Sequence, residues 1–214
     1  MEFIYPEGAT PLDQDAIRGL IPKLRTQHEL NEFEGQNIAD ALAWARRSRK
    51  IRAELLTVHG SCLLHRRMFD QTWQWAGEFR RSNMNIGVDW PHISANLRNL
   101  CDDVTFWIAA ATYPWPELAI RYHHRMILIH PFQNGNGRHG RLAANLLLAY
   151  HKQRPIDWSR GESLDNSGAT RTAYIAAMRA ADQHDYSALL EFAGSDASGD
   201  DPLSRRPAYS EDRQ

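Results

Sequence analysis

The chain has 214 residues, enough for one domain with a substantial core and too few for two full domains of ordinary size. Its 25 Lys and Arg residues nearly balance 26 Asp and Glu residues, which gives a formal net charge of -1. This balance provides no overall positive field, so we expect neither nucleic acid nor a membrane as a partner. Any site for a phosphate group must therefore be local.

The two cysteines, Cys62 and Cys101, lie in apolar helical patterns, which indicates buried reduced thiols and a reducing compartment. Residues 1–6, MEFIYP, lack the basic and apolar segments of a signal peptide. The apolar stretches elsewhere are too short or too interrupted to span a bilayer. We therefore expect a cytoplasmic protein.

The pattern of the chain predicts an all-α fold. Prolines and a glycine predict an extended lead-in over residues 1–29. Hydrophobic periodicity predicts helices over residues 30–49, 51–69, 93–111, 116–129, 138–150 and 170–181. Residues 77–88 break this period and precede Pro91, which predicts one short β-hairpin. Residues 194–214 are mostly polar and predict a disordered tail, which leaves residues 30–193 as the folded domain.

Residues 130–141, HPFQNGNGRHGR, join a glycine-rich turn to the start of a predicted helix. Free backbone N–H groups and the positive end of the helix dipole favour an anion such as phosphate there. Arg138 and Arg141 are three residues apart, so both guanidinium groups can lie on one helix face and reach successive phosphates. A Gly-Asn-Gly turn alone is often only a helix cap, but the paired arginines favour a nucleotide site.

His130 directly precedes Pro131, which ends the incoming helix and places the imidazole at the rim of the anion site. A single histidine before proline is usually structural. Beside a phosphate loop, however, an imidazole with an unperturbed pKa of about 6.5 can act as a general base and deprotonate an incoming hydroxyl. The residues therefore predict transfer of a phosphate-containing group to a hydroxyl.

The same segment resembles the signature of the Fic family, His-Pro-Phe-x-Asp/Glu-Gly-Asn-Gly/Lys-Arg-x-x-Arg, at every specified position except Asn134. Stretches within residues 64–80 resemble the family's approach to its flap, and residues 174–189 resemble its closing helices. The resemblance covers about residues 30–192. Within the family, residues 9–12 and the Asn134 variant are similar to the group called mobile mystery protein B.

The resemblance implies a helical bundle with a short β-hairpin flap beside the active-site loop. It also implies AMPylation, in which a Ser, Thr or Tyr hydroxyl of an unidentified target protein attacks the α-phosphate of ATP with His130 as general base. It assigns nucleotide binding to Gly135, Asn136, Gly137, Arg138, Arg141 and Tyr174. It assigns target docking to the flap residues Asn83, Met84, Asn85, Ile86 and Gly87. A core position is the alternative for Tyr174.

Asn134 stands where the family has Asp or Glu to bind the Mg2+ ion that accompanies ATP. An amide oxygen can ligate Mg2+ but brings no negative charge, so metal affinity should fall. Two alternatives stay open because of this residue. One is transfer of another phosphate-containing group, and the other is a nucleotide-binding regulatory protein with weakened catalysis.

Residues 30–35, LNEFEG, resemble the family's inhibitory motif Ser/Thr-x-x-x-Glu-Gly/Asn, with Leu30 in place of the hydroxyl residue. The resemblance implies that Glu34, on a helix over residues 30–45, pairs with Arg141 and displaces the γ-phosphate. A solvated position on the helix face is the alternative for this carboxylate. The resemblance also implies a toxin-antitoxin-like setting with a small regulatory partner protein.

Ten histidines, among them His123, His124 and His139, raise a metal hydrolase as a rival hypothesis. His123 and His124 are adjacent, so they point in different directions from a helix. The chain also has no H-E-x-x-H pattern and no Cys/His framework. We therefore rank the transferase above the hydrolase.

Overall fold

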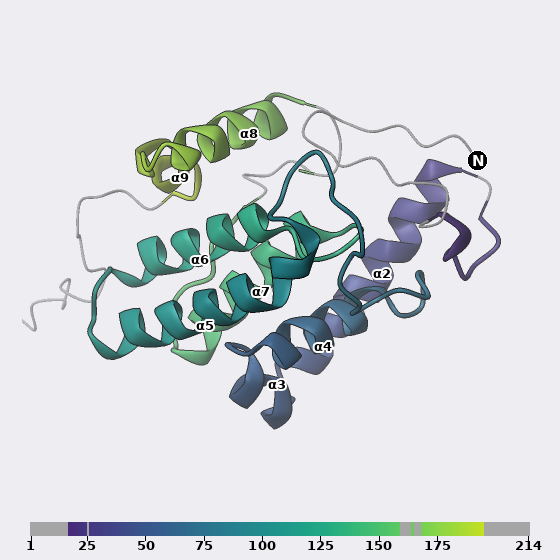
Figure 1. The fold of residues 1–214 in the computed structure, drawn as a ribbon, viewed down its shortest axis with the longest axis horizontal. Helices are drawn as coiled ribbons and strands as arrows, with labels where there is room; N and C mark the ends of the chain where they lie inside the picture. Colours follow the sequence, from purple (N-terminus) through teal and green to yellow (C-terminus); the bar gives the residue numbers. More distant parts are fainter. Residues whose placement is uncertain (1–16, 25, 159–163, 165–167, 195–214) are drawn as a thin grey trace, which may run out of the picture.

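Helices make up most of the chain in the computed structural model, which describes residues 17–24, 26–158, 164 and 168–194 (Figure 1). Their bounds are α2 Gln27–Ala45, α3 Arg49–Glu54, α4 Val58–Phe69, the 3-10 turn η1 Trp90–His92, α5 Ile93–Ala109, α6 Trp115–Ile129, α7 Asn136–Tyr150, α8 Ala169–Asp182 and α9 Ser187–Phe192. The expected all-α class is confirmed. The predicted tail beyond residue 194, and the predicted lead-in up to residue 16, lie outside the described residues.

Local capping explains where the first helices begin. Thr26 and Glu29 form a capping box, in which the Thr26 hydroxyl accepts from the Glu29 N–H at 3.1 Å and the Glu29 carboxylate accepts from the Thr26 N–H at 3.0 Å. Helix α2 therefore begins three residues before the predicted start at Leu30. The predicted helix over residues 51–69 is divided, because the Thr57 hydroxyl accepts from the Gly60 N–H at 2.9 Å and starts α4 anew.

The core is built around α6, which packs against both α5 and α7. Its buried face follows the helical period through Ala119, Tyr122 and Met126, each with none of its surface exposed. Helix α2 packs on α4, and α9 packs on both α8 and α6 (Figure 1). The loop that joins α6 to α7 therefore begins and ends at the centre of the bundle, and it lies beside α4.

The prediction of a β-hairpin over residues 77–88 is wrong, because these residues form no β-strand in the structure. Residues 83–87, here called the flap segment, form an irregular loop. The Asn83 side chain closes this loop by donating to Asp89 and by accepting from the Trp90 N–H, both at 2.9 Å. Gly87 has a φ of +106°, which turns the chain away from an extended path. These local bonds replace the strand pairing that the short alternation of residues suggested.

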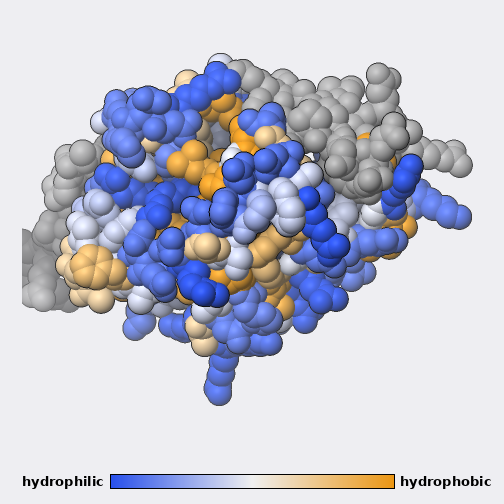
Figure 2. All heavy atoms as spheres, in the orientation of Figure 1, coloured by the Kyte–Doolittle hydropathy of each residue, from blue (hydrophilic) through white to orange (hydrophobic). Residues whose placement is uncertain are grey.

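The face of the molecule seen in Figure 2 is mostly hydrophilic, and hydrophobic side chains reach the surface in small separate groups. The large hydrophobic residues that are exposed are Ile21, Phe33, Ile86, Trp90, Phe106 and Leu128. Among the described residues, we find no helix with both the length and the apolar character needed to cross a membrane.

Three histidines, His65, His123 and His139, are fully buried in the core. Burial lowers the pKa of His123 to about 3 and that of His139 to about 4, and it holds the pKa of His65 well below 6.5. Each histidine is therefore neutral in the folded protein at neutral pH. Of the two thiols predicted to be buried, Cys101 is buried and Cys62 is only partly buried. Burial raises the pKa of Cys62 to about 11 and that of Cys101 to about 12.

We expect these histidines to make the fold sensitive to acid. Their pKa values in the unfolded chain lie near 6.5, so between that pH and about 4 the unfolded state binds more protons than the folded state. The free energy of unfolding should therefore be greatest above pH 6.5 and fall by several kcal/mol as the pH drops to about 4, since each pKa unit corresponds to about 1.4 kcal/mol. Urea unfolding across pH 4 to 8 measures this, and an unchanged midpoint between pH 7 and pH 5 would contradict it.

Candidate active site

His130 terminates α6 in a left-handed conformation, with φ 51° and ψ 60°. Its N–H donates to the Met126 carbonyl at 3.1 Å, and its carbonyl accepts from Arg80 Nε at 2.7 Å. The next residue, Pro131, prevents the helix from continuing. The side chain is only 6% exposed, so it lies deeper than the rim position expected from the sequence.

The surroundings of His130 keep its imidazole neutral. Burial is the main cause that lowers its pKa from 6.5 to about 4, and the positive charge of Arg80 lowers it further. A hydrogen bond with the backbone of Ile127 acts in the opposite direction. At neutral pH the ring therefore has a nitrogen that can accept a proton, as a general base requires.

The loop predicted to bind phosphate, residues 131–135 and here called the phosphate loop, has a shape set by Gly135 and by Asn136, the first residue of α7. Gly135 has a φ of +75°, and a Cβ at this position would lie 2.5 Å from Cζ of Phe69. The Asn136 side chain closes the loop by donating to the Phe132 carbonyl at 2.8 Å and accepting from the Phe132 N–H at 2.9 Å. The N-cap residue of α7 is Gly135, which has no side chain to accept from the first N–H groups of the helix. The loop thus presents the start of α7, with its positive dipole end, beside His130.

Replacing Gly135 with Ala should therefore destabilise the protein by about 2 to 3 kcal/mol, from the left-handed backbone and the overlap with Phe69. Gly35 is the matched control, because it lies within α2 and nothing lies within 4 Å of a Cβ added there. Gly35→Ala should stabilise the helix by up to about 1 kcal/mol. Chemical denaturation measures both variants, and equal effects would contradict the packing at Gly135.

His65 was not selected from the sequence, yet it connects this loop to α4. Its Nδ1 accepts from the Gly77 N–H at 2.9 Å, so Nε2 carries the ring proton and donates to the Asn134 carbonyl at 3.0 Å. The ring also stacks on Phe132, with 3.7 Å between the ring centroids. His65 therefore supports the phosphate loop from α4.

Glu34 lies against the site, but with a different partner from the one expected. Its carboxylate pairs with Arg138, at 2.7 Å from Nη1, and also accepts from Trp73 Nε1 at 2.7 Å. The expected pairing with Arg141 is therefore wrong in this structure. Glu34 is 2% exposed, which also excludes the alternative of a solvated carboxylate. One turn of α7 separates the two arginines, and α2 approaches the side on which Arg138 lies.

Arg141 extends back along the start of α7, since a Cβ at Gly137 would lie 3.4 Å from its Nη1. Its guanidinium carbon is 5.9 Å from the ring centroid of Tyr174. Tyr174 itself is 5% exposed, and its hydroxyl lies 2.7 Å from Nε2 of His123. The alternative of a core tyrosine thus describes Tyr174 well, and its visible role is to support Arg141.

Asn134, which replaces the family's acidic residue, directs its side chain into its own loop. Its Oδ1 accepts from the Gly135 N–H at 2.7 Å. The part of the chain that the structure describes also has no group of three or more His, Cys, Asp or Glu residues that could hold a metal ion. Asn134 therefore brings no carboxylate to the Mg2+ position that the resemblance implies.

His124, one of the histidines that raised the metal-hydrolase hypothesis, contacts Tyr186 and Asp182.

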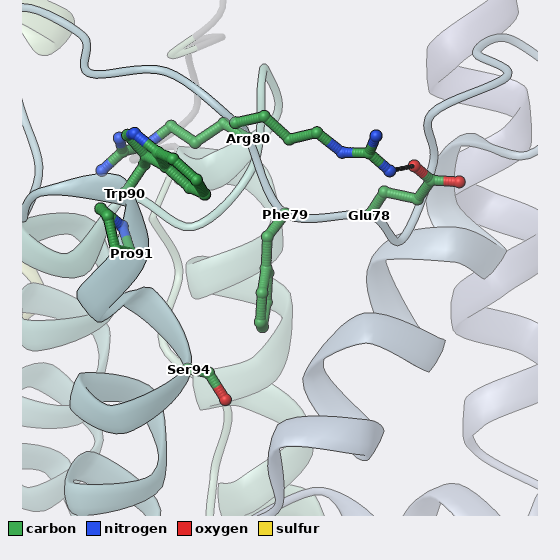
Figure 3. A pocket seen from close by; sticks show the side chains of 7 residues that line it. Glu78, Phe79, Arg80, Trp90, Pro91 and Ser94 are labelled. Carbon is green, nitrogen blue, oxygen red and sulfur yellow. Dashed lines mark hydrogen bonds and ion pairs between the residues drawn. The ribbon is translucent and has the colours of Figure 1, made fainter.

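A pocket of about 390 Å³ lies beside the flap segment (Figure 3). The residues that line it are Glu78, Phe79, Arg80, Arg81, Trp90, Pro91 and Ser94. Trp90 is 46% exposed, which makes it one of the few large aromatic side chains that a docked protein could contact. Met84 is partly buried, whereas Asn85 and Ile86 are exposed at the tip of the flap segment.

Comparison with known proteins agrees with this geometry. Residues 55–148 match the model of the Fic/DOC family. The protein adenylyltransferase Fic of Aedes aegypti is 34% identical over 83 residues, which cover 37% of this chain and 17% of that protein. The protein of the same name from Drosophila melanogaster is 30% identical over 133 residues, which cover 60% of this chain and 26% of that protein. The chain thus spans about a quarter, or less, of the length of these curated relatives.

Solved structures show the same fold. Fic-1 from C. elegans, residues 134–508, aligns with a TM-score of 0.62 and 22% identity, and covers 82% of this chain and 51% of that chain. BepC from Bartonella tribocorum aligns with a TM-score of 0.58 and 18% identity, and covers 88% of this chain and 92% of that chain. The chain therefore has the fold of Fic domains, and its residues 55–148 match the Fic/DOC family. The likeness to the mobile mystery protein B group stays a prediction.

Proposed function

We propose that this protein transfers AMP from ATP to a hydroxyl of a target protein, with His130 as the general base. The observation that supports this most is a buried, neutral imidazole at the end of α6, directly before a phosphate loop that leaves the start of α7 without a side-chain cap. Curated relatives named protein adenylyltransferase support the same reaction. The structures of BepC with AMPPNP and of a Bartonella quintana Fic domain with ADP support a nucleotide as the ligand.

In the proposed reaction, the target hydroxyl attacks the α-phosphorus of ATP and the bond from that phosphorus to the bridging oxygen breaks. The hydroxyl proton passes to the neutral ring of His130, and pyrophosphate leaves with the bond's electrons. The backbone of residues 135–138 cradles the phosphates, while Arg138 and Arg141 balance their negative charge. The Asn136 side chain is committed to the loop, so its contribution to the nucleotide comes from its backbone.

ATP would have to bring Mg2+ with its own phosphate oxygens, since Asn134 provides no charge and its Oδ1 is hydrogen-bonded within the loop. This feature of Asn134 favours the two alternative functions, whereas the other residues of the site favour AMP transfer. In one, the site transfers a different phosphate-containing group. In the other, it binds a nucleotide with weakened catalysis and acts as a regulatory protein.

Incubation with a cell lysate and ATP labelled at either the α- or the γ-phosphate distinguishes these functions. Label from α-labelled ATP alone on a protein band would support AMP transfer, and label from γ-labelled ATP alone would indicate phosphorylation. Glu34→Gly should be tested beside the wild type, because the Glu34 ion pair can mask activity. No label from either form of ATP, with either protein, would reject the transferase proposal for ATP.

A further inference from the structure

Arg80 is almost completely buried, with only 1% of its surface exposed, which is unusual for a charged side chain. Within the described residues its guanidinium forms no ion pair and bonds to backbone carbonyls instead. The bonds are Nε to His130 O at 2.7 Å, Nη1 to Ser82 O at 2.7 Å, Nη2 to Ile129 O at 3.4 Å, and Nη2 to Val88 O. A lysine, with a single ammonium group, could not span these acceptors in the same way.

These acceptors belong to two different parts of the site. Ser82 and Val88 directly flank the flap segment on either side, whereas Ile129 and His130 form the C-terminal end of α6. Carbonyls at a helix C-terminus favour a positive charge, which helps to compensate for the burial of Arg80. One side chain therefore bonds both ends of the flap segment and the backbone of His130.

The backbone around Arg80 strengthens the same connection. Its N–H donates to the Pro131 carbonyl at 2.9 Å. A Cβ added at Gly87 would lie 2.7 Å from Arg80 Nη2 and 2.7 Å from the Cβ of His130, so the flap segment passes directly against both side chains. Figure 3 shows Arg80 extending toward Trp90 and away from Glu78, whose carboxylate pairs with Arg81 on the exposed side.

We propose that Arg80 is a positioning residue that holds the flap segment and His130 in one fixed geometry. A target backbone docked on the flap segment then presents its hydroxyl at a constant distance from the imidazole. This inference rests on the proposed role of His130 as general base. A misplacement of about 1 Å between reacting groups can cost roughly 100-fold in rate, so a tether of this kind has a measurable effect.

The charge of Arg80 provides a second readout that does not depend on transfer. The positive charge of Arg80 is the second cause, after burial, that lowers the pKa of His130. The negative charge of Asp89 in turn acts to raise the pKa of Arg80. Removal of the charge should raise the pKa of His130 toward 6.5. Replacement by Lys keeps the charge but loses the planar fork, so it separates the electrostatic effect from the positional one.

The experiment compares Arg80→Met and Arg80→Lys with Arg81→Met, a matched control whose side chain is 84% exposed and pairs only with Glu78 among the described residues. We expect Arg80→Met to raise the pKa of His130 in an NMR titration, to speed amide exchange in residues 82–88, and to lower kcat roughly 100-fold with little change in the KM for ATP. Arg80→Lys should keep the low pKa but still speed exchange and lower kcat. Arg81→Met should match the wild type in the NMR titration and in amide exchange.

Titration and amide exchange need no transfer activity, so an inactive wild type would reject the proposed function while these two readouts still decide the role of Arg80. A folded Arg80→Met protein with wild-type exchange in residues 82–88 would overturn the inference. If Arg80→Met does not fold, Arg80→Lys decides the inference instead, because it keeps the charge and loses the planar fork. Faster exchange in residues 82–88 of that variant would support the inference, and wild-type exchange in it would overturn it.

Discussion

Replacement of His130 by Ala is expected to lower the rate of AMP transfer roughly 100- to 10,000-fold, the usual contribution of a positioned general base. The loss should fall on kcat, because the phosphates are held by the start of α7 and its arginines rather than by the imidazole. His65, which contacts the same loop, could not replace it readily, because both of its ring nitrogens are in hydrogen bonds to Gly77 and Asn134. Single-turnover transfer of labelled AMP and calorimetric ATP binding measure the two effects separately.

Two further variants control for this result. His130→Asn removes the base but suits the left-handed backbone, in which Asn is one of the residues most often found, so it should be as inactive as His130→Ala. His59→Ala removes a histidine whose side chain is 64% exposed on α4, and its activity should equal that of the wild type. Transfer by His130→Asn at a rate near that of the wild type would contradict the role of the imidazole.

The features of the site that are local in sequence could be predicted, and the longer-range ones could not. The glycine-rich turn, the helix end before Pro131 and the start of α7 all depend on neighbouring residues, so the expected loop between two helices is what the structure has. The position of His130 relative to that loop followed from the same local pattern. The burial of His130 could not be predicted in this way, because it depends on the flap segment and on Arg80, which lies 50 residues earlier in the chain.

A contact between distant residues accounts for one wrong prediction, and short-range side-chain bonds account for another. Glu34 and Arg138 are 104 positions apart, and spacing on α7 alone could not decide which of its two arginines α2 would reach. The flap residues alternate over a stretch too short to specify a strand, and the Asn83 side chain satisfies the backbone there instead. Arg80 and His65 were visible only as members of a family-like pattern. A charged residue just before an expected loop is usually solvated, so nothing local indicated the burial of Arg80.

Replacement of Glu34 by Gly is expected to raise both ATP affinity and transfer, by roughly tenfold or more. The carboxylate occupies Arg138, one of the two arginines proposed to bind phosphates, at 2.7 Å, so ATP must displace it before that arginine is available. If only a fraction of the molecules have Arg138 free, the apparent affinity falls by that fraction, and a bias of about 1.4 kcal/mol corresponds to a factor of ten. Isothermal titration with ATP and the rate of labelled AMP transfer measure the effect.

The control for Glu34→Gly is Glu32→Gly, which places the same helix-weakening residue on α2 where the carboxylate is 68% exposed and pairs with His28. If loosening of α2 alone activated the site, the two variants would behave alike. Activation confined to Glu34→Gly would instead assign the effect to the bond with Arg138. Trp73→Phe adds an intermediate case, because it removes the 2.7 Å bond to the other carboxylate oxygen and leaves the ion pair in place. Its activity should lie between those of the wild type and Glu34→Gly, since Trp73 orients the carboxylate whose charge blocks Arg138.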